Sequence, residues 1–377
     1  MLSGYGRDAK VLIVANAAGQ LFLQFSIFIM PFYLRALGYG MDSMGGLFFS
    51  VQTFTGGMFF LIAGQISIRL GYRKTLLLGA VLGLMGGRLF QVLAFNKYVL
   101  LIGFFLVGAN MGIRQPNFSA LLSEEVGEKL RHHAFSISFG LGTIFNALGV
   151  LTAGFAPPDF LTDTFGLTPE IAYRLVISLA LLQFALVIPA LLVIQDVPVK
   201  NPRINWNREL VIKILKFSLP SALIGLGAGI TIPYMSLYFN IRFGQTLAAI
   251  SGVFFFQQLV MGLGSFGLPK LVEKIGPVNV ITSFQLVAAL LFATFPLIDV
   301  FLLAAFLYIV RSILMNIVWP INDSFMMGFF TTEEKATAAG IRRAFSTFMR
   351  GIGNYIGGAY YSRSRSVTPS TQPLRYM

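Results

Sequence analysis

The sequence predicts an all-α membrane protein made of two related helical halves. Its 377 residues are 56% hydrophobic and only 11% charged, whereas soluble domains carry roughly a quarter of charged residues. The apolar residues form long segments that are separated by short basic turns, and the spacing of the first segments recurs in the later ones. A spanning helix takes about 20 residues, so this length allows roughly a dozen spans and no sizeable soluble domain.

We expect each long apolar segment to be one membrane-spanning helix. The first begins close behind a basic N-terminus, but it is too long for a signal-peptide core and is expected to be retained. The predicted spans lie near 11–35, 43–68, 75–95, 98–122, 133–156, 171–194, 211–239, 246–272, 277–297, 299–328 and 335–361.

The charged turns predict the orientation of these spans. With the N-terminus in the cytoplasm, we count seventeen cations in the inner segments, Arg342 and Arg343 among them, and only Arg35, Lys97, Arg174 and Arg242 in the outer loops. Basic residues stay on the cytoplasmic side of a membrane. We therefore expect a multi-pass protein of the cytoplasmic membrane with a cytoplasmic N-terminus. The net charge of +13 is explained by these turns rather than by a nucleic-acid-binding face.

An internal repeat predicts the domain organisation. Gly71 matches Gly276 at an offset of 205 (276 − 71), and at the same offset Gln52 and Gly57 match Gln257 and Gly262. Repeats of this kind are typical of transporters whose halves are related by an axis along the membrane normal. We expect an N-terminal six-helix half at 1–195, a cytoplasmic linker at 196–209, a C-terminal half of five spans at 210–361, and a polar tail at 362–377.

The tail departs from the repeat. After Gly357 and Gly358 a twelfth apolar span is due, but the remaining residues are polar and too few to cross a bilayer. The sequence leaves two interpretations open: a native chain of eleven spans, or a truncated or frame-shifted twelfth span.

One basic turn carries a resemblance to a known family. Residues 64–75 read GQISIRLGYRKT, which is similar to the loop between helices 2 and 3 of the major facilitator superfamily, commonly written GxLaDrxGrrk. The acidic residue of that pattern is replaced by Ile68. The resemblance covers about residues 5 to 361 and implies two six-helix halves that rock about a central cavity.

The resemblance also implies a cytoplasmic gate. The family's acidic residue helps to fasten the two halves by facing the start of helix 11, which Ile68 cannot do. Acidic residues at the start of the eleventh span could meet basic residues of the turn instead, in a contact with its charges exchanged. The expected gate residues are Gly64, Arg69, Gly71, Arg73, Lys74, Glu273, Lys274, Gly276, Glu333 and Glu334.

Polar side chains at helical spacing predict the substrate cavity. Asn16, Gln20 and Gln24 follow at i, i+4 and i+8, so they share one helix face. In the family, helices 1, 4, 7 and 10 line the cavity. The expected cavity residues are Asn16, Gln20, Gln24, Asn110, Arg114, Asn117, Thr231, Tyr234, Tyr238, Arg311, Ser312, Asn316, Trp319 and Asp323. The alternative is that these groups only hydrogen-bond neighbouring helices.

Arg311 stands out because it falls near the bilayer midplane, where a charge costs at least ~3 kcal/mol. We expect it to take part in substrate binding or gating. Asp323 is the only carboxylate inside a predicted span, so proton coupling through a membrane carboxylate is not favoured. A drug-antiporter signature is degraded as well, because Phe104 stands where its arginine belongs before Gly108.

These observations predict a secondary transporter for a small organic solute; they do not identify the solute, and an anionic one is our first hypothesis. Efflux of lipophilic compounds is the alternative. A membrane-embedded enzyme would need a cluster of acids, bases or metal ligands, and the sequence offers none. We expect no cofactor, no metal and no nucleic-acid partner; the expected partners are the solute and the lipid bilayer, around a monomer.

Overall fold

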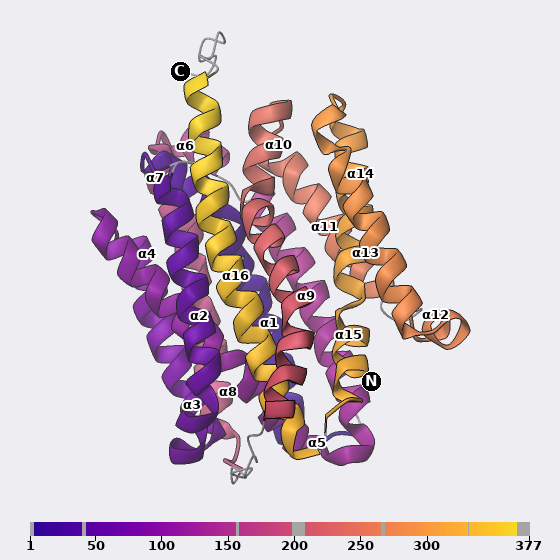
Figure 1. The fold of residues 1–377 in the computed structure, drawn as a ribbon. Helices are drawn as coiled ribbons and strands as arrows, with labels where there is room; N and C mark the ends of the chain where they lie inside the picture. The colour runs from indigo at the N-terminus through magenta and orange to yellow at the C-terminus, as the bar shows by residue number, and fades with distance from the viewer. Residues whose placement is uncertain are drawn as a thin grey trace.

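The computed structural model describes residues 4–39, 43–155, 158–197, 208–264, 268–330 and 332–367. Every regular element in these ranges is a helix (Figure 1), which confirms the all-α membrane fold. Most of the expected linker and the end of the expected tail, residues 198–207 and 368–377, lie outside the described residues. We call the end of the bundle that holds Tyr5 and Gly71 the basal end, and the opposite end, which holds Asp299, the distal end.

The first group of helices covers the six spans expected before the linker. Its elements are α1 (Arg7–Ala36), α2 (Ser43–Leu70), α3 (Tyr72–Gly79), the π-helix η1 (Ala80–Arg88), α4 (Leu89–Val92), α5 (Lys97–Phe155), α6 (Pro158–Phe165), α7 (Pro169–Ser178), η2 (Leu179–Leu181) and α8 (Leu182–Val193).

Helix α5 contains two of the predicted spans, and its backbone is helical throughout, including the bend between them. Arg114 bonds to Asn16, and Asn146 bonds to Gln24. The two α1 residues are eight positions apart, or about 12 Å along the helix, whereas the two α5 residues would lie about 48 Å apart if α5 were straight. Helix α5 must therefore fold back on itself between Arg114 and Asn146, as the basal bend in Figure 1 shows.

The second group completes the bundle. Its elements are α9 (Arg208–Thr231), η3 (Ile232–Tyr234), α10 (Met235–Phe243), α11 (Leu247–Gly264), α12 (Leu268–Ile275), α13 (Pro277–Ala293), η4 (Phe295–Leu297), α14 (Phe301–Ile317), α15 (Trp319–Met327) and α16 (Thr332–Val367).

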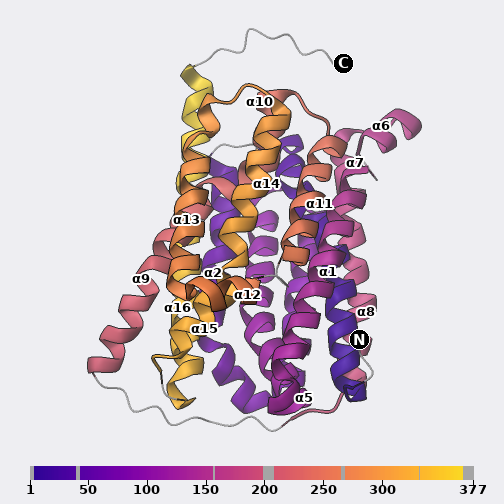
Figure 2. The ribbon, with the colours of Figure 1, turned by 90° about the vertical axis from the view of Figure 1, so that its right-hand side faces the viewer.

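Three predicted spans differ from these helices. In place of the span predicted at 246–272, helix α11 ends at Gly264. The last part of the predicted span belongs to the separate helix α12, which runs sideways from the bundle (Figures 1 and 2). The span predicted at 299–328 breaks at Val318, because Pro320 in the first turn of α15 has no N–H to continue the ladder of α14. The last span, predicted to end at residue 361, continues as helix to Val367.

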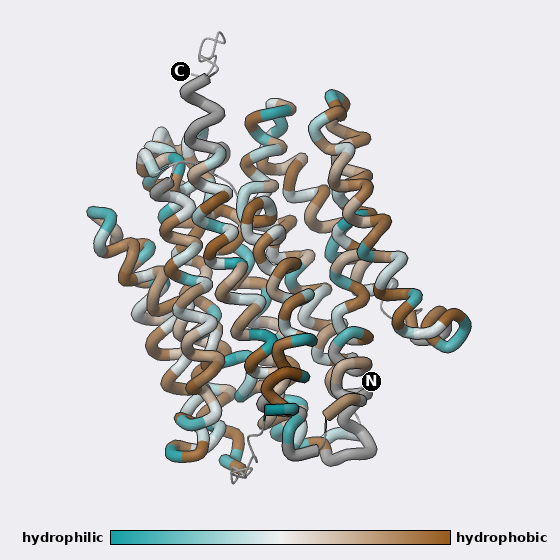
Figure 3. The backbone as a smooth tube through the Cα atoms, in the orientation of Figure 1, coloured by the Kyte–Doolittle hydropathy of each residue, from teal (hydrophilic) through white to brown (hydrophobic). Residues whose placement is uncertain are grey.

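Nine helical segments among the described residues are long and apolar enough to cross a membrane, and α14 is a shorter apolar helix. Helix α16 lies outside that set because it carries many polar and basic residues, yet it is wedged into the bundle. Figure 1 shows it in front, between α2 and α9. In Figure 3 the hydrophilic residues gather at the turns and in patches between helices, and apolar residues cover much of the sides.

The hydrophobic core joins the two groups only in the distal part of the bundle. One cluster there contains residues of both groups: Phe28 of α1 packs edge-on against Phe254 of α11, with ring centroids 5.8 Å apart, and Phe49 of α2 packs against Tyr234 at 6.1 Å. The four clusters of the basal part each draw their buried residues from a single group. The described core is thus continuous at the distal end and divided at the basal end.

Candidate functional site

The polar stripe of α1 faces α5. Arg114 donates from Nη1 to Asn16 Oδ1 at 2.9 Å, and Gln24 Nε2 donates to Asn146 Oδ1 at 3.0 Å. A Cβ atom on Gly142 would lie 3.8 Å from Gln20 Cγ, so the middle residue of the stripe meets α5 as well. The three residues therefore lie on the same face, and two of them hydrogen-bond a neighbouring helix.

A small cavity lies beside this stripe, inside the first group. Its volume is about 40 Å³, and its polar lining is Asn16, Arg114 and Gln183. Gln183 on α8 is only 3% exposed, and its Oε1 has no hydrogen-bond partner among the described protein atoms. A cavity of this size has room for water, which could bond both Gln183 and Arg114.

Two asparagines of α5 are buried against other helices of the first group, one against α2 and one against η1. Asn117 accepts a short hydrogen bond from the Ser67 hydroxyl and donates from Nδ2 to the Ile113 carbonyl at 2.7 Å. Asn110 packs directly against Gly83 of the π-helix η1, where any larger residue would overlap it, and its Oδ1 lacks a described partner. π-Helices are rare and occur frequently at functional sites.

The tyrosines and the threonine near the break between α9 and α10 have distinct surroundings. Tyr234 donates its hydroxyl hydrogen bond to the Asn354 carbonyl at 2.7 Å, and Asn354 Nδ2 donates in turn to the Phe49 carbonyl at 3.1 Å. Through Asn354 of α16, Tyr234 is thereby linked to α2 of the first group. Tyr238 packs among the rings of Phe243 and other aromatic residues, and the Thr231 hydroxyl donates to the Gly227 carbonyl of its own helix at 3.1 Å.

Arg311 lies inside the second group. Its guanidinium carbon is 4.8 Å from the ring centroid of Phe292 on α13, and the residue is 9% exposed. The next residue, Ser312, is also buried, and its carbonyl accepts from Asn316 Nδ2 at 2.7 Å. The charge of Arg311 is therefore placed over an aromatic face, which stabilises a cation in a poorly solvated position.

Arg342 is the buried cation that sequence reasoning missed, because it was counted among the loop cations. It is 2% exposed, donates to the Ser221 hydroxyl at 3.0 Å, and stacks over Trp319 at 5.8 Å. Trp319, an expected cavity residue, is therefore in contact with the Arg342 guanidinium through its ring. Asp323 belongs to α15, but its side chain is outside the described residues.

Arg88 shows a similar arrangement in the first group. It ends η1, is 3% exposed, and donates to the Ser26 hydroxyl and to Gln91 Oε1, the latter at 2.7 Å. The isolated cation within an apolar segment was a visible signal in the sequence. Its two partners are residue types that occur in many spans, so no spacing indicated them.

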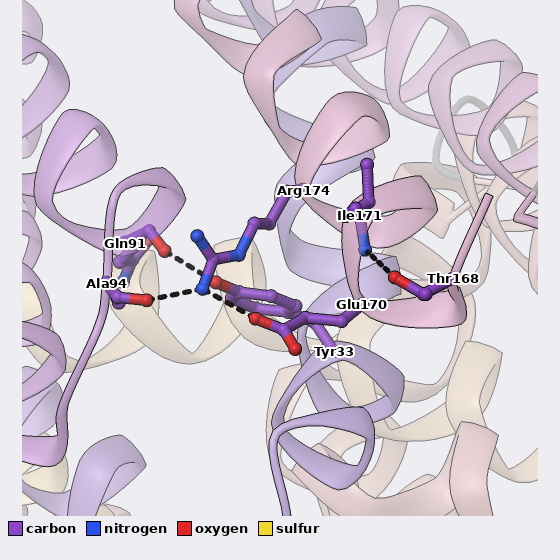
Figure 4. Close-up of polar contacts among 7 residues, drawn as sticks. All are labelled: Tyr33, Gln91, Ala94, Thr168, Glu170, Ile171 and Arg174. Atoms are coloured by element: carbon purple, nitrogen blue, oxygen red, sulfur yellow. Dashed lines mark hydrogen bonds and ion pairs between the residues drawn. The ribbon is translucent and has the colours of Figure 1, made fainter.

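A polar contact at the distal end fastens α1, α4 and α7 (Figure 4). Arg174 bridges the Ala94 carbonyl and Glu170, and Tyr33 donates to the Gln91 carbonyl at 3.0 Å. Arg174, expected only as a loop cation, therefore has a packing role.

The basal turn at Gly71 is built from backbone geometry. Gly71 has φ +85° and precedes α3, and a Cβ atom there would overlap the carboxylate of Asp196. Asp196 Oδ1 accepts from the Arg73 backbone N–H at 3.1 Å, and the Arg73 guanidinium donates to the Ile194 carbonyl at 2.8 Å. Asp196 therefore caps α3 and holds this turn against the end of α8.

The corresponding turn of the second group has the same backbone but different neighbours. Gly276 has φ +84° and precedes α13, yet no atom lies near its Cβ position. Glu273 and Lys274 are exposed on α12. Of the other expected gate residues, Gly64, Arg69 and Lys74 are exposed, the Glu333 side chain lies outside the described residues, and Glu334 is half-buried.

Solved structures of transporters share this fold. A bacterial homologue of the human lysosomal transporter Spinster, in an inward-facing and unoccupied conformation, matches with a TM-score of 0.72 at 13% identity, covering 96% of this chain and 83% of that one. A mutant of the nucleoside transporter NupG matches with a TM-score of 0.72 at 14% identity, covering 97% and 93% of the two chains. The human organic anion transporter MFSD10 matches with a TM-score of 0.66 at 14% identity, covering 94% and 93%. At these identities the likeness concerns the fold alone.

No curated protein matches the sequence. The family model of the Major Facilitator Superfamily, however, matches residues 12–354, which is most of the chain. Members of this family are membrane transporters rather than enzymes, and they bind small-molecule substrates. The chain therefore belongs to the major facilitator superfamily.

Proposed function

We propose that this transporter moves a small organic anion across the cytoplasmic membrane by alternating access. The observation that carries the proposal is an excess of arginine over carboxylates within the helix bundle. The arginines concerned are Arg88, Arg114, Arg311 and Arg350, whereas the described carboxylates lie at the ends of the apolar segments or in connections.

Charge compensation is the reason that this excess favours an anion. The ion pairs recorded among the described side chains, Arg174 with Glu170 and Arg242 with Asp299, are both at the distal end. Cations at membrane depth cost at least ~3 kcal/mol each when they are not compensated. An anionic solute between the helices would supply negative charge that the described spans lack.

The division of the core supports alternating access. The distal cluster joins both groups and the basal clusters do not, as expected for a conformation that opens at the basal end. The concentration of cations at that end favours a cytoplasmic location for it and for the N-terminus. We further propose that the two groups act as the two halves, 1–195 and 210–361, joined by the linker at 196–209, in a monomer.

Within this proposal, the polar residues expected to form the cavity act in solute binding, and the residues at the basal turns act as the gate. The second candidate is efflux of lipophilic compounds. It is favoured by the groove of Leu47, Ser50, Val51, Phe54, Ile352 and Tyr355 on the side of the bundle, which is lined largely by apolar atoms.

The purified protein tests both candidates by thermal shift. A ligand that binds only the folded state raises Tm, by about 2.7 kcal/mol of stabilisation at one hundred times its Kd. The panel is carboxylates, phosphate monoesters, neutral nucleosides and lipophilic cations. We expect a shift with a carboxylate or a phosphate ester, followed by uptake of that compound into proteoliposomes. A shift with lipophilic cations alone would replace the proposal by the efflux function.

A further inference from the structure

Two arginines of α16 share a face of this helix that no predicted site residue occupies. We propose that Arg343 and Arg350 form the contact for the anionic group of the solute, a carboxylate or phosphate that enters between the two groups of helices. The inference deepens the proposed function and rests on it. It adds α16 to the helices expected to contact the solute, beside Arg311 on α14.

The opposite face of α16 is apolar and exposed. Phe345 and Ile352 are 40% and 39% exposed, and each follows one of the two arginines by two positions. Residues two apart on a helix point about 200° away from each other. Since large exposed apolar side chains on a spanning helix face lipid, Arg343 and Arg350 point away from lipid. In Figure 2, α16 and α1 lie on opposite sides of the bundle, so this direction leads into it.

Neighbouring helices cover the two remaining sides of α16. On one side its backbone packs closely against α9, with the Ser346 carbonyl at Gly225 and the Arg350 carbonyl at Gly229. On the other side Ser50 of α2 donates to the Gly351 carbonyl at 2.6 Å. The two arginines therefore lie on the strip of α16 between α9 and α2, where the two groups of helices meet.

The side chains on this strip suit an anion. Arg350 is exposed despite the close packing of its backbone, and no hydrogen bond or ion pair of its side chain is recorded among the described residues. Seven positions separate it from Arg343, so the two lie about 10 Å apart along one face. A guanidinium presents donors in a planar fork that fits carboxylate and phosphate oxygens. Thr347 and Asn354 add polar groups beside them.

The absence of cysteine from the sequence permits a direct test. In the variant Arg350→Cys, the single thiol is treated with an anionic and a cationic methanethiosulfonate reagent in proteoliposomes. The ratio of the two rates is divided by the ratio for free mercaptoethanol. We expect the normalised ratio to favour the anionic reagent by at least about threefold, because Arg343 attracts it in a partly screened site. Adding Arg343→Gln should return the ratio to that of the free thiol.

Controls separate this inference from other outcomes. Ile352→Cys, on the lipid face, should react slowly with both reagents. Thr347→Cys keeps both arginines, so its normalised ratio reports the attraction of the anionic reagent by Arg343 and Arg350 even if the arginine variants do not fold. A normalised ratio near one at the interior positions, or equal labelling at Ile352→Cys, overturns the assignment. Soluble glycerol phosphate should slow the labelling of Thr347→Cys; slowing by vesicles of anionic lipid alone would identify a lipid headgroup site and also overturn it. None of these readouts requires transport, so they stand apart from the test of the proposed function.

Discussion

The ring of Phe348 on α16 lies against Gly57 on α2, 2.9 Å from the point that a Cβ atom of Gly57 would occupy. A second contact mirrors the first: Gly262 on α11 faces Thr143 on α5, with a Cβ distance of 3.3 Å. The glycines are 205 positions apart (262 − 57), and so are their partners (348 − 143). Both contacts join the two groups of helices, so the sequence repeat is also a repeat of the surface on which the groups meet.

We expect Gly57→Ala to weaken this surface. The added methyl group overlaps the Phe348 ring, so one of the two helices must shift. The matched control is Gly227→Ala on α9, where no atom lies near the Cβ position and the change should stabilise the helix by about 0.5–1 kcal/mol. Thermal unfolding in detergent should place Gly57→Ala below the control. Equal Tm values would show that the ring moves aside without cost.

The two glycines with positive φ provide a second prediction. Gly71→Ala and Gly276→Ala should each lose roughly 1–3 kcal/mol, because residues with a Cβ atom are strained at positive φ combined with extended ψ. Gly71→Ala should lose more, since its methyl group also meets the Asp196 carboxylate. Chemical unfolding of the single variants and of Gly71→Ala with Asp196→Ala measures the difference. The double variant should lose less than the two single changes added together; simple additivity would contradict the contact.

The basal turns explain why much of the fold could be predicted from the sequence. Gly71 and Gly276 were aligned by spacing alone, and their φ values are +85° and +84°. In both turns the glycine N–H bonds four residues back and its carbonyl accepts from four residues ahead. A left-handed glycine between two apolar segments is local information. The lengths of the apolar segments and the positions of the basic turns can also be read from neighbouring residues alone. Together these signals predict the order of the helices.

The candidate site depended on contacts that spacing does not encode. The stripe of Asn16, Gln20 and Gln24 was visible as a stripe, but nothing in the sequence indicated that it meets α5. Arg342 was counted with the loop cations because the position of the α16 start relative to the membrane depends on packing against α9. The role of Asp196 could not be predicted for the same reason, because it contacts the turn at Gly71, which is 125 positions away (196 − 71).

Arg311 gives the third prediction. Arg311→Ala should abolish transport while folded protein is obtained at normal yield, and Arg311→Lys should recover little if planar contact matters. Phe292→Leu keeps an apolar neighbour but removes the aromatic face, and should reduce stability by about 0.5–2 kcal/mol. Transport in proteoliposomes and Tm are measured together. Unchanged transport in the alanine variant would leave Arg311 with a packing role only.

The last prediction concerns the gate at the basal end. In the described conformation Arg73 is bonded to the Ile194 carbonyl and capped by Asp196, both at the end of α8. We predict that when the basal end closes, Arg69 and Arg73 meet Glu333 and Glu334, where the N-terminus of α16 favours carboxylates. Each partly solvated pair should contribute about 1 kcal/mol to the closed state.

Spin labels at Leu70→Cys on α2 and Ala339→Cys on α16 report the opening of this end by their distance distribution. Reversing Arg69 and Arg73 to Glu should increase the population with the long distance, and adding Glu333→Lys with Glu334→Lys should restore it. Because reversal of Arg73 also removes its bond to Ile194, a second series reverses only Arg69 and keeps that bond. Lys74→Glu, an exposed change of equal charge in the same turn, should shift the populations less. If the charge reversals on α2 and α16 add instead of compensating, the two helices do not form this contact.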